Sequence, residues 1–125
     1  MSENTPFFPE RAPIDAYGDH GFRFAETSHR GSLLILPSGI YGWEPEALAD
    51  VDEQAFSRVF AEAVEIDFLL FGTGEKRLIP PPEVSRAFVD AGVGLEIMDT
   101  GAACRTYNVL LGEARAVAAA LLAVE

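Results

Sequence analysis

Residues 66–74 read IDFLLFGTG, an almost continuous apolar run that ends in a glycine-rich turn. A run of this length, bounded by turn residues, is typical of a strand buried on both faces of a parallel sheet. Residues 82–91 then read as a helix with proline in its first turn, and residues 93–98 read as another strand. This half of the chain therefore predicts two parallel neighbouring strands joined by a right-handed helical crossover.

The next segment begins MDTGAACRTYN at residues 98–108 and continues into an alanine-rich tail. We predict one long helix here, which starts at about Thr100 as the N-cap and ends at about Leu122. Gly112 would then lie in mid-helix, where glycine costs about 1 kcal/mol relative to alanine. Its presence there indicates the close approach of another backbone.

The N-terminal half is patterned differently. Residues 1–13 contain three prolines and little periodicity, which predicts an extended arm. Residues 14–43 form short runs broken by glycine and predict three or four strands, one of them the apolar run at residues 32–36. Residues 52–63 predict an amphipathic helix with Asp50 or Asp52 as its N-cap. Together these patterns predict an arm at residues 1–13 and a single α/β domain at residues 14–125.

Composition excludes several classes of function. The 125 residues include 20 acidic and 9 basic side chains, and the net charge of -11 argues against nucleic-acid binding. A single cysteine excludes an intrachain disulfide and fits a reducing compartment. No apolar run reaches 18 residues, and the N-terminus lacks the pattern of a signal peptide, so we expect a cytoplasmic protein without membrane insertion.

Topology brings polar residues to one edge of the predicted sheet. If the two strands are parallel neighbours, the loops at residues 72–74 and 99–101 meet beyond their carboxyl ends, where open α/β sheets bind ligands. The N-terminus of the last helix would add a partial positive charge suited to an anion. The predicted ligand-binding residues are Gly72, Thr73, Gly74, Thr100, Cys104, Arg105 and Asn108.

Each of these signals also has a structural explanation. The loop resembles a dinucleotide fingerprint, but Arg77 stands where the third glycine is needed, so a tight turn is the simpler interpretation. Cys104 could be an activated thiol at a helix N-terminus or a small core residue. Arg105, Asn108 and Arg115 could share a helix face that holds a carboxylate, or could tether neighbouring segments.

Two further features remain open between structure and binding. Tyr41 and Trp43 could form an apolar protein-contact patch or could seal the core. Residues 44–67 contain eight acidic residues and one basic residue, which indicates a solvated face that could also receive a basic partner. The histidines lack metal-ligand spacing, and the sequence predicts no metal, no cofactor and no catalytic residues.

Several of these motifs together resemble the Mth-type domain family. The resemblance covers residues 14–123, including the turn at 39–43, the strand end at 70–74 and the segment at 98–115. This family includes the mitochondrial complex I assembly factor 3 and the adipogenesis-associated Mth domain-containing protein. The resemblance implies a compact three-layer α/β domain with a mixed central sheet, packed helices and extra antiparallel N-terminal strands.

The resemblance also implies a kind of function. It favours a non-catalytic domain that binds proteins and assists the assembly of a membrane-associated, respiratory-type complex. The alternative is a domain that binds, or acts on, a small anionic molecule at the loops of residues 72–74 and 99–105.

Overall fold

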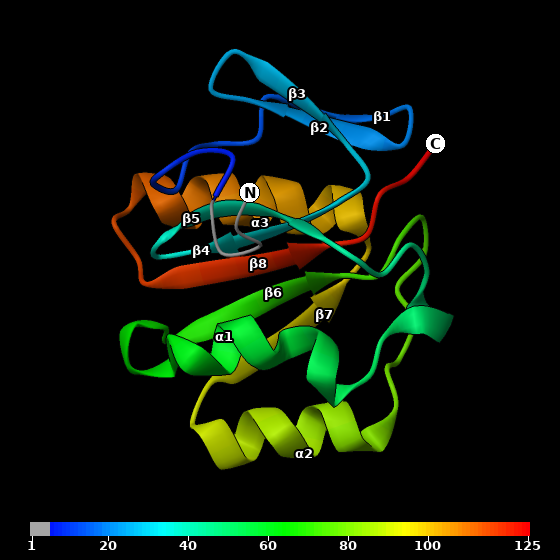
Figure 1. Ribbon diagram of the computed structural model, residues 1–125, viewed down its shortest axis with the longest axis vertical. Coiled ribbons are helices and arrows are strands. Elements are labelled where there is room, and N and C mark those ends of the chain that lie inside the picture. Colours follow the sequence, from blue (N-terminus) through cyan, green and yellow to red (C-terminus); the bar gives the residue numbers. More distant parts are fainter. Residues whose placement is uncertain (1–5) are drawn as a thin grey trace.

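The computed structural model describes residues 6–125 as a five-stranded mixed sheet, a three-stranded antiparallel sheet and packed helices (Figure 1). The order of strands is β5-β4-β8-β6-β7 in the larger sheet and β1-β2-β3 in the smaller one. The strands are β1 Ala16–Gly18, β2 Gly21–Phe24, β3 Thr27–Arg30, β4 Ser32–Leu36, β5 Gly39–Trp43, β6 Phe68–Gly72, β7 Gly94–Met98 and β8 Val117–Leu121. The helices are α1 Ser57–Ala61, α2 Pro82–Ala91 and α3 Thr100–Gly112, with 3-10 turns η1 Leu48–Asp50, η2 Glu53–Phe56 and η3 Ala63–Glu65.

Hydrophobic cores cover both faces of the larger sheet. On the face covered by α1 and α2, an aromatic cluster of Trp43, Phe56, Phe71 and Phe88 packs with ring centroids 5.0–5.8 Å apart. On the other face, α3 and β2 contribute Tyr107, Phe22 and Phe24 to a second buried cluster. Figure 1 shows α3 behind the sheet and α1 in front of it, which confirms the predicted three-layer fold with a mixed central sheet.

The predicted strand–helix–strand unit is confirmed. β6 and β7 are parallel neighbours with Phe68 opposite Gly94, and α2 connects them. The predicted helix at residues 52–63 is divided into η2 and α1, and the side chain of Asp52 caps it by accepting a hydrogen bond from the Ala55 N–H. Residues 14–43 contain five strands rather than three or four, because β1 and β3 are short and mostly exposed and so lack a clear apolar pattern.

The prediction of one helix from Thr100 to Leu122 is wrong. Helix α3 ends at Gly112, and a turn with Ala114 at a φ of 58° leads into β8. Strand β8 pairs with β4 on one side and with β6 on the other, and all five of its residues are buried. Alanine has the highest intrinsic helix propensity. In this protein the burial of a central strand outweighs that preference. The small alanine side chains let the helical layers on both faces of the sheet approach it closely.

Two local predictions about α3 also need correction. Its N-cap is Asp99 rather than Thr100, because the Asp99 side chain accepts a hydrogen bond of 2.8 Å from the Ala102 N–H. Gly112 is the last residue of the helix, and a Cβ placed on it would meet no atom within 4 Å. Close approach of another backbone therefore does not explain this glycine.

The two edges of the larger sheet differ. Beside β5, the Phe7 N–H donates to the Ile40 carbonyl at 2.7 Å, and the Ile40 N–H donates to the Phe8 carbonyl at 2.9 Å. Of the predicted arm at residues 1–13, Phe7 and Phe8 thus contact β5 at Ile40 through an isolated bridge, while residues 1–5 lie outside the described part of the chain. At the other edge, β7 pairs with β6 alone among the strands of residues 6–125.

The burial of β8 predicts that its alanines tolerate little added volume. Ala119 is 0% exposed and pairs with both Ile35 and Leu70. We expect Ala119→Leu to lower the free energy of unfolding by about 1–3 kcal/mol, because overpacking a tight core forces strain. Ala61→Leu, at an exposed position of α1, should change it by less than about 0.5 kcal/mol. Urea denaturation measures both, and equal effects would contradict this role of β8.

Candidate functional site at the carboxyl ends of the sheet

The two loops predicted to meet do meet. The Thr100 N–H donates to the Gly74 carbonyl at 2.8 Å, and the Gly74 N–H donates to the Thr100 hydroxyl at 3.0 Å. Gly72 lies against the same helix end, because a Cβ placed on it would come within 2.8 Å of the Thr100 Cα. The loop after β6 is therefore bonded to the start of α3 at close range.

Thr100 also connects this junction to the central strand. Its side chain is fully buried, and its hydroxyl donates to the Leu122 carbonyl at 2.7 Å while accepting from Gly74. The Leu122 N–H in turn donates to the Gly72 carbonyl at 2.9 Å. One hydroxyl thus holds together the ends of β6 and β8 and the first turn of α3.

The polar groups at this edge are largely used inside the protein. The Asp99 carboxylate accepts a hydrogen bond from the Ala102 N–H, and the Gly74 carbonyl accepts one from the Thr100 N–H. The Thr73 hydroxyl donates to the Lys76 carbonyl at 2.6 Å and accepts from the Leu78 N–H at 2.9 Å. The tight turn expected of this loop contains Gly74, whose backbone φ is positive at 108°. These bonds account for the pattern of residues as a structural junction.

Cys104 is a core residue. Its side chain is 2% exposed in the cluster beneath α3, beside the buried Tyr107. Burial raises the pKa of the Cys104 thiol to about 12, and the nearby Arg105 offsets this only in part. The thiol is therefore protonated at neutral pH. Burial also raises the pKa of Tyr107, whose hydroxyl donates to the Ala12 carbonyl at 2.9 Å.

Asn108 tethers the N-terminal segment. Its amide oxygen accepts from the Ile14 N–H and its amide nitrogen donates to the Ile14 carbonyl, each at 2.8 Å. This paired contact is the internal tether that was one of the two interpretations of Asn108. Arg115 lies beyond the end of α3, with its guanidinium carbon 5.8 Å from the centre of the Phe68 ring. The predicted helix face shared by Arg105, Asn108 and Arg115 is therefore wrong for Arg115.

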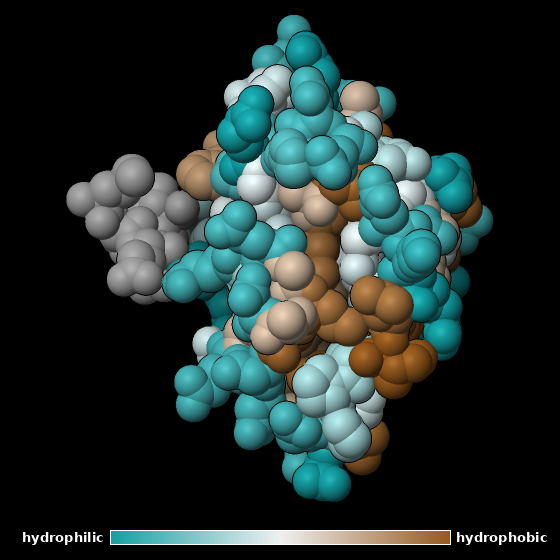
Figure 2. Space-filling model, turned by 90° about the vertical axis from the view of Figure 1, so that its right-hand side faces the viewer, coloured by the Kyte–Doolittle hydropathy of each residue, from teal (hydrophilic) through white to brown (hydrophobic). Residues whose placement is uncertain are grey.

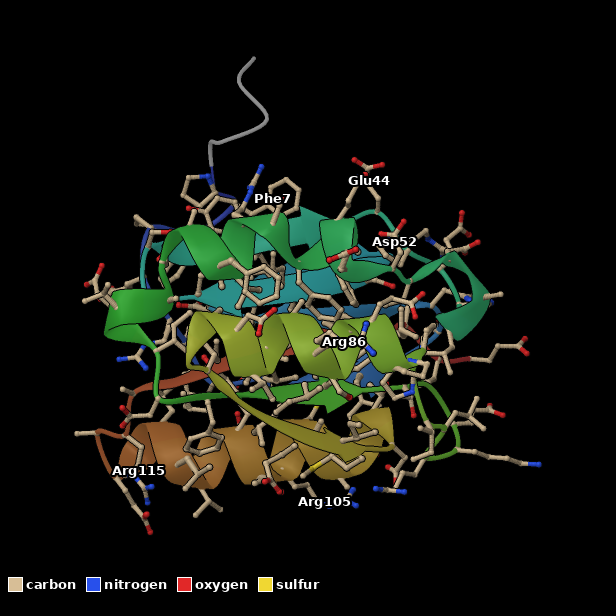
Figure 3. The ribbon with its side chains drawn as sticks, turned by 90° about the horizontal axis from the view of Figure 1, so that it is seen from below. Phe7, Glu44, Asp52, Arg86, Arg105 and Arg115 are labelled. Carbon is tan, nitrogen blue, oxygen red and sulfur yellow. The ribbon has the colours of Figure 1, made fainter. Side chains whose placement is uncertain are left out.

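Arg105 is the exposed member of the predicted ligand set on α3. Its guanidinium contacts the Tyr17 hydroxyl at 3.4 Å, which places β1 against the first turns of the helix. Figure 3 shows Arg105 on α3, at the end of that helix opposite Arg115. It is the cationic side chain of the predicted set that remains available to a ligand or a partner.

Tyr41 and Trp43 do not form an exposed patch. They are 6% and 9% exposed, and the Trp43 indole N–H donates to the Ala55 carbonyl at 2.8 Å. The Arg58 guanidinium covers the Tyr41 ring, 4.5 Å from its centre. Both aromatic residues therefore belong to the core under η2 and α1, which agrees with the structural interpretation of the pair.

Apolar surface lies instead in the loop between β6 and α2. Leu78 is 46% exposed and Ile79 is 65% exposed. Figure 2 shows the face of the molecule at the carboxyl ends of β6 and β8, where brown apolar surface is open to solvent. Sequence reasoning missed this pair, although two large apolar residues between a charged turn and three prolines belong to no periodic element. No helix among residues 6–125 has the length and apolar character needed to cross a membrane.

The chain belongs to the family described as "Protein of unknown function (DUF498/DUF598)", whose model matches residues 14–122. Mouse NADH dehydrogenase [ubiquinone] 1 alpha subcomplex assembly factor 3 is 32% identical over 115 residues, which cover 92% of this chain and 62% of the mouse protein. This chain therefore spans less than two thirds of that relative. An uncharacterized protein from Rhodobacter capsulatus is 38% identical over 98% of this chain and 93% of its own length.

Solved structures agree with this assignment. A crystal structure described as an outer membrane protein from Bartonella henselae has a TM-score of 0.90 at 52% identity, covering 94% of this chain and 99% of that one. A Bordetella pertussis protein described as an Mth938-like domain has a TM-score of 0.78 at 27% identity, covering 98% and 92%. The resemblance to the Mth-type domain family is thereby confirmed.

The Thr100 junction predicts a strong dependence on one hydroxyl. Thr100→Val keeps the shape of the side chain but leaves the Gly74 N–H and the Leu122 carbonyl without this partner. We expect the free energy of unfolding to fall by about 2–4 kcal/mol, because each buried polar group without a partner costs about 1–3 kcal/mol. Thr100→Ser, which keeps the hydroxyl, should lose clearly less. Equal losses in thermal and urea denaturation would show that the hydroxyl contributes nothing.

The burial of Cys104 predicts an unreactive thiol in the native protein. With a pKa of about 12 and 2% exposure, the thiolate is scarce and shielded from reagents. Ellman's reagent at pH 8 should modify the native chain only at the rate of unfolding, and should modify the urea-unfolded chain within minutes. Rapid stoichiometric modification of the folded protein would restore the hypothesis of an activated cysteine.

Proposed function

We propose that this protein is a non-catalytic, cytoplasmic protein-binding domain that assists the assembly of a membrane-associated, respiratory-type complex. The observation that carries the proposal is its similarity to a protein named as an assembly factor of NADH dehydrogenase, which extends over 92% of the chain. The similarity includes the domain as a whole rather than one short motif. A role in binding other proteins is therefore the simplest activity that the related domains can share.

The geometry at the carboxyl edge supports binding rather than catalysis. The hydroxyls of Thr73 and Thr100 are engaged in internal hydrogen bonds, and the Cys104 thiol is buried and protonated. The same edge exposes Leu78 and Ile79. Exposed apolar side chains that lie together are a common feature of protein-contact sites.

A second candidate is the binding of a small anion at the loops of residues 72–74 and 99–105. The contact between the Gly74 loop and α3, together with the exposed Arg105, favours it. A ligand that binds only the native state raises the melting temperature. An anionic metabolite that stabilises the wild-type protein, but not Arg105→Ala, would support this candidate over the first. Equal responses of the two proteins would remove it.

The assembly role predicts a defect in cells that lack this protein. We expect native gel electrophoresis to show reduced fully assembled NADH dehydrogenase and accumulated subcomplexes, with recovery on expression of the wild-type chain. A Leu78→Glu, Ile79→Glu double variant should fail to restore assembly, because charge on the exposed loop opposes apolar contact. Val64→Glu, at another exposed apolar position, is the matched control and should restore it. Normal assembly in cells without the protein would refute the proposed function.

A further inference from the structure

The outer edge of β7 presents backbone groups that have no strand beside them. The Gly94 N–H donates to the Asp67 carbonyl, and the Met98 carbonyl accepts from the Thr73 N–H, so these residues of β7 point their backbone groups toward β6. Since alternate residues of a strand direct their N–H and C=O groups to opposite sides, Leu95 and Ile97 direct theirs outward. Within residues 6–125, the outward N–H groups of Leu95 and Ile97 have no backbone acceptor.

At the other edge of the sheet, the N-terminal segment pairs with β5 at one residue, Ile40. Beside β5, Phe7 and Phe8 exchange backbone hydrogen bonds with Ile40. Beside β7, one side chain makes the corresponding contact, because the Arg77 Nε–H donates to the outward Ile97 carbonyl at 3.0 Å. Figure 3 shows β7 between α2, which carries Arg86, and α3, which carries Arg105. Proteins generally protect such edges, because an open edge is a template for another strand.

We propose that the β7 edge binds an extended segment of a client protein, which adds to the sheet as a sixth strand and places a basic residue opposite Glu96. This inference rests on the proposed protein-binding function and specifies its surface and its partner. The N–H groups of Leu95 and Ile97 and the Leu95 carbonyl, which have no backbone partner within residues 6–125, supply the hydrogen bonds, as in other cases of strand addition. The client is recognised through its extended backbone and through the residues that flank it.

The charge of Glu96 indicates which kind of segment the β7 edge would bind. Glu96 lies at the centre of β7, is exposed, and has no basic side chain within ion-pair distance in residues 6–125. Opposite charges on directly facing residues of neighbouring strands stabilise their pairing, and like charges weaken it. A lysine or arginine of the client would therefore fit this position.

The charge of Glu96 also argues against a second copy of this chain as the strand that pairs with β7. A symmetric antiparallel pairing that bonds Leu95 of one copy to Ile97 of the other places the two Glu96 side chains directly opposite each other. Each copy also carries a net charge of -11, which opposes close association. A basic segment of another protein meets neither difficulty.

Apolar surface lies beside the carboxyl end of this edge. The loop that contains Arg77 continues directly into the exposed Leu78 and Ile79, and the apolar surface of this face is visible in Figure 2. A client strand with an apolar residue beyond its basic centre could contact this loop. The edge and the loop together would give both register and contact area.

The test uses two synthetic peptides and the full chain. Both are nine-residue peptides of alternating threonine and valine, one with lysine at its centre and the other with glutamate. We expect the lysine peptide to bind about fivefold more tightly, the order of effect for facing charges in neighbouring strands, and to slow hydrogen exchange at the Leu95 and Ile97 amides. The substitution Glu96→Lys, at an exposed position of β7, should reverse the preference, so that the glutamate peptide binds more tightly.

A second variant removes the edge without removing the fold. Ile97→Pro eliminates an outward N–H that β6 does not use, and proline is tolerated on edge strands. It should abolish peptide binding, whereas Ile97→Val should retain it. No slowing of exchange at either amide, or the same peptide preference in Glu96→Lys, would overturn the proposal. A wild-type dimer that Ile97→Pro converts to a monomer would assign the edge to a second copy instead.

The variant also separates this inference from the proposed function. If cells lacking the protein have an assembly defect that Ile97→Pro repairs as well as the wild type, the edge proposal fails and the assembly role remains. If such cells have no defect, the proposed function fails, whatever the peptides show. If the defect persists with Ile97→Pro but not with Ile97→Val, both proposals are supported.

Discussion

The insertion of β8 between β4 and β6 is the constraint on which the rest of the structure depends. This strand pairs antiparallel with β4, from the N-terminal half, and parallel with β6, from the C-terminal half. Its three consecutive alanines allow α3 on one face and the aromatic cluster on the other to approach the same plane. The two halves of the chain therefore become one sheet only when the last described strand is in place.

The position of β8 also arranges the carboxyl edge. Because the chain leaves β8 at Leu122, that residue lies beside Gly72 and the Thr100 hydroxyl, and the three segments close on one another. The junction resembles a ligand site in sequence because threonine and glycine serve both purposes. In this protein the hydrogen bonds of these residues are mostly internal. The side chains that remain accessible to a partner are Arg105 and, in the loop after β6, Leu78 and Ile79.

The sequence predicts the parts of the fold in which local pattern and tertiary environment agree. The apolar runs of β4 and β6 and the helix α2 fall into this class, as does the meeting of the two loops, which follows from strand topology. β8 could not be predicted in this way, because its alanines favour a helix and only burial between two strands makes them a strand. The roles of Asn108 and Tyr41 depended on which distant segment packs against them, and no local spacing contains that information.

The central claim is that the interior of the sheet is closed by β8 while β7 leaves one edge open for a partner. Amide hydrogen exchange of the free protein, followed residue by residue by NMR, tests it most directly. We predict that the amides of Ala118, Ala119 and Ala120 exchange only through global unfolding. In β7, the Glu96 amide, which points toward β6, should be protected, while the amides of Leu95 and Ile97 exchange rapidly. Equal protection of Leu95, Glu96 and Ile97, or rapid exchange throughout β8, would contradict the account.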